Sequence, residues 1–266
     1  MNRIDKTIKE LRTQGQKILS PYITAGDPEP GMTVGLMHAL VEGGADILEI
    51  GIPFSDPMAE GPVIQAAMER ALAHHVHCDN VFDMIATFRK KDDKTPVILM
   101  GYLNPVEQYG YERFAKAAKA SGVDGTILVD LPPEESNDLS PIWEKYGLHC
   151  IYLCSPTTED ERLTLINSFG RGYAYYVSLK GVTGAEMADL DLVKKRYLHC
   201  KQQIRLPIMV GFGIKTPDMV SKIASFADGV IIGAALIQEI LAAYQNKNDV
   251  NKVAAQFIHT IRCAMP

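Results

Sequence analysis

The run DILEIG, at residues 46–51, is short and almost continuously apolar. Such a run is typical of a parallel strand that is covered on both faces. Seven similar runs occur along the chain, and each is followed by a segment with helical spacing: ILSPYI (18–23), PVILMG (96–101), DGTILV (124–129), HCIYLC (149–154), YAYYVS (173–178), LPIMVG (206–211) and DGVIIG (228–233). Eight strand and helix repeats without a Pro/Ser-rich linker predict an α/β fold, a single closed (β/α)₈ TIM barrel.

The length of the chain agrees with one barrel. It has 266 residues, and α/β barrels commonly fill about 250 residues as one unit. Before the first run, IDKTIKELRTQG (4–15) places Ile4, Ile8 and Leu11 on one stripe of an amphipathic helix. We therefore expect one domain over residues 1–266, in which an extra N-terminal helix within residues 1–15 closes the barrel bottom.

Composition excludes several classes of function. Lys and Arg number 27 against 32 Asp and Glu, a net charge of −5 that argues against a basic nucleic-acid-binding face. The five Cys form no C-x-x-C pair and are expected to be reduced. The first twenty residues are charged throughout, and no stretch approaches the roughly 18 apolar residues of a membrane span. We expect a cytoplasmic protein that binds neither membrane nor nucleic acid.

Glu49 is the clearest misfit in the chain, because it is a carboxylate within an apolar strand run. By alternation, Ile47, Glu49 and Gly51 share one face of the strand. A Glu near the top of an apolar barrel lumen should have a raised pKa, which suits a general acid and base at neutral pH. The alternative is a structural Glu that is paired with a buried Lys or Arg.

Glycines close the last strand runs. Gly184 follows the sixth run, Gly211 and Gly213 follow the seventh, and Gly233 follows the eighth. In barrels of this class, backbone N–H groups after strands seven and eight, together with a helix N-terminus, bind phosphate. Glycine permits the close approach of backbone to the anion. The sequence therefore predicts a phosphate site, and the alternative is a set of ordinary turn glycines.

Three further features carry weaker predictions. The cluster AHHVHC (73–78) lacks a distant Cys or His set for metal binding, so we interpret it as a solvated helix face. Lys180 could form a Schiff base, although a loop Lys beside Gly more often serves as a surface or phosphate-steering charge. Asp130 either takes part in catalysis or holds its loop, and the sequence leaves both open.

Five longer motifs carry a resemblance to a known family. They are LEIGIPFSDPMAEGPVIQ (48–65), GYLNPV (101–106), VDLPPEE (129–135), YYVSLKGVTG (175–184) and GFGIKTP (211–217). Together they resemble the tryptophan synthase alpha subunit over essentially the whole chain. The resemblance implies a carbon–carbon lyase of L-tryptophan biosynthesis, which cleaves indole-3-glycerol phosphate into indole and glyceraldehyde 3-phosphate by a retro-aldol step without a cofactor or metal.

The resemblance also implies roles for individual residues. Glu49 matches the family's residue that transfers protons. Glu60 matches the acid that binds the indole N–H, and Tyr175 matches a Tyr that lies beside the glycerol chain. The phosphate-binding backbone matches Gly184, Gly213, Gly233 and Ala234. The indole pocket matches Tyr22, Met100, Tyr102, Ile127, Leu153, Phe212 and Ile232. Glu60 and Thr183 would lie on two loops that close over the substrate.

Two positions depart from the family pattern. The family has Asp where this chain has Glu60, which keeps the charge but adds one methylene. The family usually has Ser where this chain has Ala234, which removes one hydroxyl from the phosphate while the backbone amides remain. We expect phosphate binding to survive the second change. An alternative is that both changes mark a chain that has lost catalysis and acts only as an activator of a beta subunit.

The implied partner is a beta subunit that holds pyridoxal phosphate and consumes the indole, in an α₂β₂ heterotetramer. The matching partner surface consists of Pro53, Asp56, Asn104 and Pro105.

A third interpretation of the function, beside the lyase and the activator, is a Schiff-base aldolase that uses Lys180.

Overall fold

The computed structural model describes residues 1–177, 187–211 and 213–266. Its strands are β1 (Ile18–Thr24), β2 (Leu48–Gly51), β3 (Val97–Gly101), β4 (Gly125–Leu128), β5 (His149–Cys150), β6 (Leu153–Cys154), β7 (Ala174–Val177), β8 (Ile208–Gly211) and β9 (Gly229–Ile232). They pair in parallel in the order β5-β4-β3-β2-β1-β9-β8-β7-β6. The predicted TIM-barrel fold class is confirmed.

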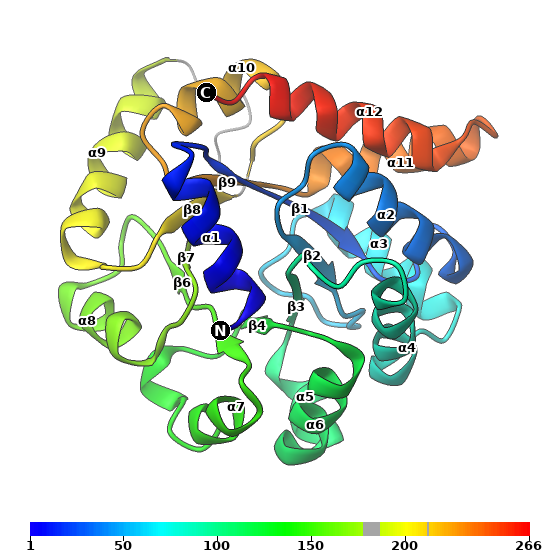
Figure 1. The fold of residues 1–266 in the computed structure, drawn as a ribbon, viewed down its shortest axis with the longest axis horizontal. Helices are drawn as coiled ribbons and strands as arrows, with labels where there is room; N and C mark the ends of the chain where they lie inside the picture. The colour runs from blue at the N-terminus through cyan, green and yellow to red at the C-terminus, as the bar shows by residue number, and fades with distance from the viewer. Residues whose placement is uncertain (178–186, 212) are drawn as a thin grey trace.

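The fifth predicted run differs from a single strand, and this difference shows how the barrel closes. Residues 149–154 form β5 and β6, which lie at the two ends of the strand order. Between them, the N–H of Ile151 donates to the carbonyl of Thr126 at 2.9 Å, and the carbonyl of Tyr152 accepts from Tyr175 at 3.0 Å. One short segment thus joins β4 to β7, so the sheet curls into a ring (Figure 1).

Helices surround this ring (Figure 1). In the described part of the chain they are α1 (Arg3–Thr13), α2 (Thr33–Glu42), α3 (Pro62–Ala73), α4 (Cys78–Arg89), α5 (Leu103–Tyr109), α6 (Tyr111–Ser121), α7 (Ser140–Tyr146), α8 (Asp160–Phe169), α9 (Met187–Gln203), α10 (Pro217–Ala224), α11 (Ala234–Gln245) and α12 (Val250–Cys263), with 3₁₀ helices at Pro30–Met32 and Pro133–Glu135. In the described ranges, none of these helices has the length and apolarity needed to cross a lipid bilayer.

The strands bury both faces, which explains why their runs are almost continuously apolar. On β2 and the residue before it, Ile47 belongs to the cluster that fills the barrel interior, whereas Leu48 and Ile50 belong to the cluster between strands and helices. Successive strand side chains point to opposite faces, so both layers need apolar residues. Helix α1 adds Ile4, Ile8 and Leu11 to the interior cluster.

Asp124 fastens three segments together just before β4. Its carboxylate accepts from Arg3 Nη1 at 2.9 Å, from Arg89 Nη2 at 3.0 Å and from the N–H of Val97 at 3.0 Å. The Asp124 side chain is only 4% exposed and that of Arg89 10%. Removing one partner of a buried ion pair leaves an uncompensated charge, which is costly.

We therefore expect Asp124→Ala to lower the free energy of unfolding by about 3 to 5 kcal/mol, as measured by urea denaturation. The control is Glu112→Ala, which breaks the exposed ion pair with Lys145. It should leave the midpoint almost unchanged because exposed ion pairs contribute little. Equal midpoints for the two variants would contradict the anchoring role of Asp124.

Candidate active site

A cavity of about 310 Å³ opens at the carboxyl ends of the strands. Nearly every strand contributes to its wall, as expected for the functional end of a barrel. The lining residues are Tyr22, Glu49, Ala59, Glu60, Gly61, Pro62, Val63, Ile64, Met100, Val129, Leu153, Tyr175, Val177, Gly213, Ile214, Lys215, Ile231, Gly233, Ala234 and Gln238. A mostly apolar wall with a few converging polar groups is the usual form of a small-molecule site.

Glu49 lies on this wall and is fully buried. Its Oε1 accepts from the hydroxyl of Tyr173 at 2.7 Å and from the hydroxyl of Ser20 at 3.1 Å. Its Oε2 has no hydrogen-bond partner among the described residues. Burial raises the pKa of Glu49 to about 7, although the two hydroxyls act in the opposite direction. The raised pKa agrees with the sequence prediction. The alternative is a Glu49 paired with a buried Lys or Arg, but the described partners of its carboxylate are two hydroxyl groups.

Glu60 lies in the turn before α3 and is 9% exposed. The turn is held by the Tyr102 hydroxyl, which accepts from the N–H of Ala59 at 3.0 Å, and by Gln65 Nε2, which donates to the Glu60 carbonyl at 2.9 Å. Gly61 caps the helix and Pro62 occupies its first turn. Burial raises the pKa of Glu60 to about 7 as well.

Two buried tyrosines place their hydroxyl groups against the neighbouring strand, where the positions they cover are glycine. A Cβ on Gly51 would lie 2.1 Å from the Tyr22 hydroxyl oxygen, and a Cβ on Gly211 would lie 2.2 Å from that of Tyr175. Burial holds the pKa of both tyrosines well above its usual value, so each keeps its proton near neutral pH. The Tyr22 and Thr24 hydroxyls are 3.2 Å apart.

Another part of the cavity lining suits an anion. Gly233 is the N-cap of α11, and Ala234 is its first residue. The first N–H groups of a helix have no partner within it, and the helix dipole favours negative charge there. Gly213 has a positive φ of 78°, which glycine adopts without strain. Lys215 also lines this cavity. The arrangement can bind a phosphate through the backbone with one nearby cation.

The structure brings together some of the predicted indole-pocket residues but not all of them. Tyr22, Met100 and Leu153 line the cavity. Ile127 lies in the barrel interior cluster, outside the lining. Ile232 lies in the outer cluster between strands and helices, whereas its neighbour Ile231 lines the cavity, because adjacent strand residues face opposite ways. Tyr102 supports the Glu60 turn from outside the lining.

Four predicted residues fall outside the described part of the chain. These are Phe212 of the indole pocket, Gly184 of the phosphate site, Thr183 of the second closing loop and Lys180, the Schiff-base candidate.

The predicted partner surface lies beside the cavity rather than in it. Pro53, Asn104 and Pro105 border a surface groove of about 410 Å³, and Asp56 is exposed on the loop after β2.

Asp130 has two possible roles from the sequence, in catalysis or in holding its loop. Its carboxylate accepts from the N–H of Leu103 at 2.7 Å and so holds the start of α5. This contact favours the loop-holding role.

The histidine cluster lies in the turn between α3 and α4, so a helix face is the wrong description. The chain leaves α3 at Ala73 and enters α4 at Cys78. His74, His75 and His77 are exposed, in agreement with a solvated segment. Over the described residues, no three His, Cys, Asp or Glu side chains come together in a way that could hold a metal ion.

Sequence reasoning missed Ser20 and Tyr173, the two residues that contact the Glu49 carboxylate. Each lies two positions before a pocket tyrosine, Tyr22 or Tyr175, and therefore on the same interior face. The alternation could have placed them inside the barrel. It could not show that they meet Glu49, because Tyr173 reaches it from a strand that does not pair with β2.

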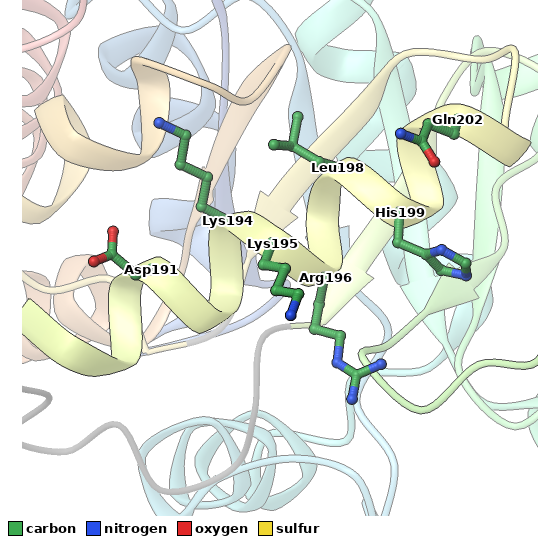
Figure 2. A pocket seen from close by; sticks show the side chains of 7 residues that line it. All are labelled: Asp191, Lys194, Lys195, Arg196, Leu198, His199 and Gln202. Carbon is green, nitrogen blue, oxygen red and sulfur yellow. The ribbon is translucent and has the colours of Figure 1, made fainter.

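A second hollow, of about 480 Å³, lies along the exposed side of α9 (Figure 2). The side chains that line it all come from that helix and include Lys194, Lys195 and Arg196. His199 there pairs with Asp160 at 2.9 Å. The hollow lacks the converging buried polar groups found at the barrel mouth, so we treat the cavity around Glu49 as the candidate site.

Comparison with known proteins points in the same direction. The family model described as "Tryptophan synthase alpha chain" matches residues 8–264. The tryptophan synthase alpha chain of Legionella pneumophila (strain Lens) is 62% identical over 265 residues, which cover 100% of this chain and 97% of the relative.

Solved structures agree in fold as well as in sequence. The crystal structure of tryptophan synthase subunit alpha from Legionella pneumophila str. Paris is similar with a TM-score of 0.95 and 60% identity, covering 100% of this chain and 98% of that one. A chain in the X-ray structure of the tryptophan synthase complex from Pyrococcus furiosus matches with a TM-score of 0.81 and 34% identity, over 92% and 97% of the two chains.

Proposed function

Because this chain belongs to the tryptophan synthase alpha chain family, we propose that its cavity carries out the alpha reaction. In this reaction indole-3-glycerol phosphate is cleaved to indole and glyceraldehyde 3-phosphate. The observation that carries the proposal is the pair of buried carboxyl groups, Glu49 and Glu60, on the wall of one apolar cavity.

The cavity lining offers groups that suit both parts of this substrate. The flat indole ring needs an apolar slot, which Tyr22, Met100 and Leu153 supply. The phosphate needs N–H donors, which the start of α11 at Gly233 and Ala234 supplies. The bond that breaks joins indole C3 to the glycerol chain, so the reacting atoms would lie between these groups.

Glu49 is assigned both proton transfers. In its neutral form it gives a proton to indole C3, which leaves a positive charge on the ring. As a carboxylate it then takes the proton from the hydroxyl on the carbon attached to C3. The electrons of that O–H bond form the aldehyde carbonyl, and those of the breaking carbon–carbon bond restore the indole ring. The proton count is balanced, and Glu49 ends neutral again.

Glu60 is assigned the stabilisation of the transient ring cation. An ionised carboxylate beside the indole N–H offsets that charge, and it acts more strongly in a site from which water is excluded. The reactive state therefore has one proton on the pair, and Glu49 carries it. Since burial raises the pKa of both groups to about 7, this singly protonated state is well populated near neutral pH.

The two departures from the family pattern are compatible with activity. Glu60 lines the cavity despite its extra methylene, which supports the role assigned to it. Ala234 lacks a hydroxyl, yet the first turn of α11 keeps its N–H groups and contains no acidic residue. No described contact favours an activator without catalysis over a lyase.

We propose further that the chain works with a beta subunit that holds pyridoxal phosphate and consumes the indole, in an α₂β₂ assembly. The support is the similarity to a chain of the tryptophan synthase complex. The groove that Pro53, Asn104 and Pro105 border, together with the exposed Asp56 on the loop after β2, is the proposed docking surface. No cofactor is needed by the chemistry assigned to this chain.

We expect Glu49→Gln to lower the rate of indole formation by about 10²- to 10⁴-fold, the usual contribution of a general acid and base. Binding of indole-propanol phosphate should be nearly unchanged, because Gln keeps the shape of the side chain. Steady-state indole release and calorimetric titration measure the two quantities. Glu42→Gln makes the same change on the exposed surface of α2 and should alter neither. Near-normal turnover by Glu49→Gln would refute the assignment.

The pH dependence of kcat/KM should be bell-shaped with its maximum near 7. As the pH falls, Glu60 gains a proton and no longer offsets the ring cation. As the pH rises, Glu49 loses the proton that it must deliver. Because both pKa values are raised to about 7 and the groups interact, the two limbs belong to the pair rather than to one residue.

The variant Glu60→Gln separates the two limbs of this profile. It should be slower at every pH and should lose the part of the acid limb that arises from Glu60, while the titration of the substrate phosphate remains. Indole release measured across the pH range, with and without the substitution, provides the comparison. A rate that rises steadily through pH 7 would contradict the need for a protonated Glu49.

A further inference from the structure

Ser20 is a buried polar residue that the proposed reaction does not yet use. It lies on β1 between apolar neighbours and is 0% exposed. An unpaired hydroxyl in such a place would cost free energy. Its Oγ donates to Glu49 Oε1 at 3.1 Å, the same oxygen that accepts from Tyr173 at 2.7 Å. Both contacts therefore fall on one oxygen of the carboxyl group.

We propose that Ser20 is a positioning residue for the proton transfers: with Tyr173 it holds Oε1 of Glu49 and leaves Oε2 as the atom that carries the proton and exchanges it with the substrate. This inference rests on the proposed function for its meaning in catalysis. The placement of the proton on Oε2 can be tested without substrate.

The two oxygens of a protonated carboxyl group differ in what they can bind. A neutral carboxylic acid has one carbonyl oxygen, which only accepts hydrogen bonds, and one hydroxyl oxygen, which carries the proton. Two hydroxyl groups already donate to Oε1, so Oε1 is suited to be the carbonyl oxygen. Oε2 is buried without a partner among the described residues, and Glu49 lines the cavity. A proton on Oε2 therefore has no acceptor among the described residues that competes for it, and it is available to a substrate.

The same contacts favour the ionised form of Glu49 after it has given up its proton. Both donors stabilise the carboxylate, whereas burial and the charge of Glu60 oppose it. The described titratable groups that interact with Glu49 or line the same cavity come from several elements: Glu60 before α3, Tyr22 on β1, Tyr173 and Tyr175 at β7, and Lys215 after β8. Loss of the Ser20 hydroxyl should therefore raise the pKa of Glu49.

Infrared spectroscopy of the isolated chain can test this without substrate. The C=O stretching band of protonated Glu49 is identified by its absence in Glu49→Gln. In Ser20→Ala this band should move to higher wavenumber, because its carbonyl oxygen loses one donor. Its titration midpoint should rise by about one pH unit, the difference expected between one hydrogen bond to a charged acceptor and the same bond to a neutral one. Ser20→Cys, of nearly the same shape but a weaker donor, should shift both quantities in the same direction by less.

The matched control is Thr126→Val, which also deletes a buried strand hydroxyl. Thr126 Oγ1 accepts from Trp143 Nε1 at 2.8 Å, in the outer layer of the barrel. This variant should leave the Glu49 band and its midpoint unchanged, even if it lowers the unfolding temperature. Ser20 variants in which the band and the midpoint equal those of the unsubstituted chain would overturn the proposal.

Kinetics separate this proposal from the proposed function. If the unsubstituted chain cleaves indole-3-glycerol phosphate, the alkaline limb of its kcat/KM profile should move to higher pH in Ser20→Ala and stay in place in Thr126→Val. An unmoved limb in Ser20→Ala would count against Ser20. Absence of cleavage by the unsubstituted chain, alone and with the beta subunit, would instead refute the proposed function, while the infrared result would still decide the placement of the proton.

Discussion

The burial of the Glu49 carboxyl group in an apolar barrel is the constraint on which the rest of this site depends. An ionised carboxylate in such a place costs several kcal/mol unless it is compensated. Here the described partners are two hydroxyls on one oxygen, so the compensation is partial and the pKa rises to about 7. A full ion pair with Lys or Arg would keep Glu49 ionised and would prevent it from delivering a proton.

The same constraint bears on the proposed phosphate site. A cluster of buried cations near Glu49 would lower its pKa and remove the acid form. The backbone at Gly213, Gly233 and Ala234 offers N–H groups and a helix dipole instead, whose effect falls off within one helical turn. Lys215 is the one Lys or Arg among the described lining residues. A chain with a net charge of −5 can thus bind an anion locally.

Much of the barrel could be predicted from the sequence, because apolar runs and alternation report directly on strands that are buried on both faces. The run at 149–154 was predicted as one strand, yet it divides into two because it bonds to different neighbours on its two sides. Ile231 rather than Ile232 lines the cavity, a matter of strand register that a motif match does not resolve. Tyr173 could not be assigned to Glu49, since this contact depends on which strands face each other across the barrel. Ser20 lies on the strand that pairs with β2, but alternation alone does not show which way its hydroxyl points.

Neutron diffraction from a deuterium-exchanged crystal below pH 7 tests the central claim most directly, because it locates the proton on Glu49. We expect deuterium on Oε2, with the hydroxyl deuterium atoms of Ser20 and Tyr173 both directed at Oε1. Deuterium on Oε1, or a Ser20 hydroxyl that is turned away from Glu49, would contradict this claim.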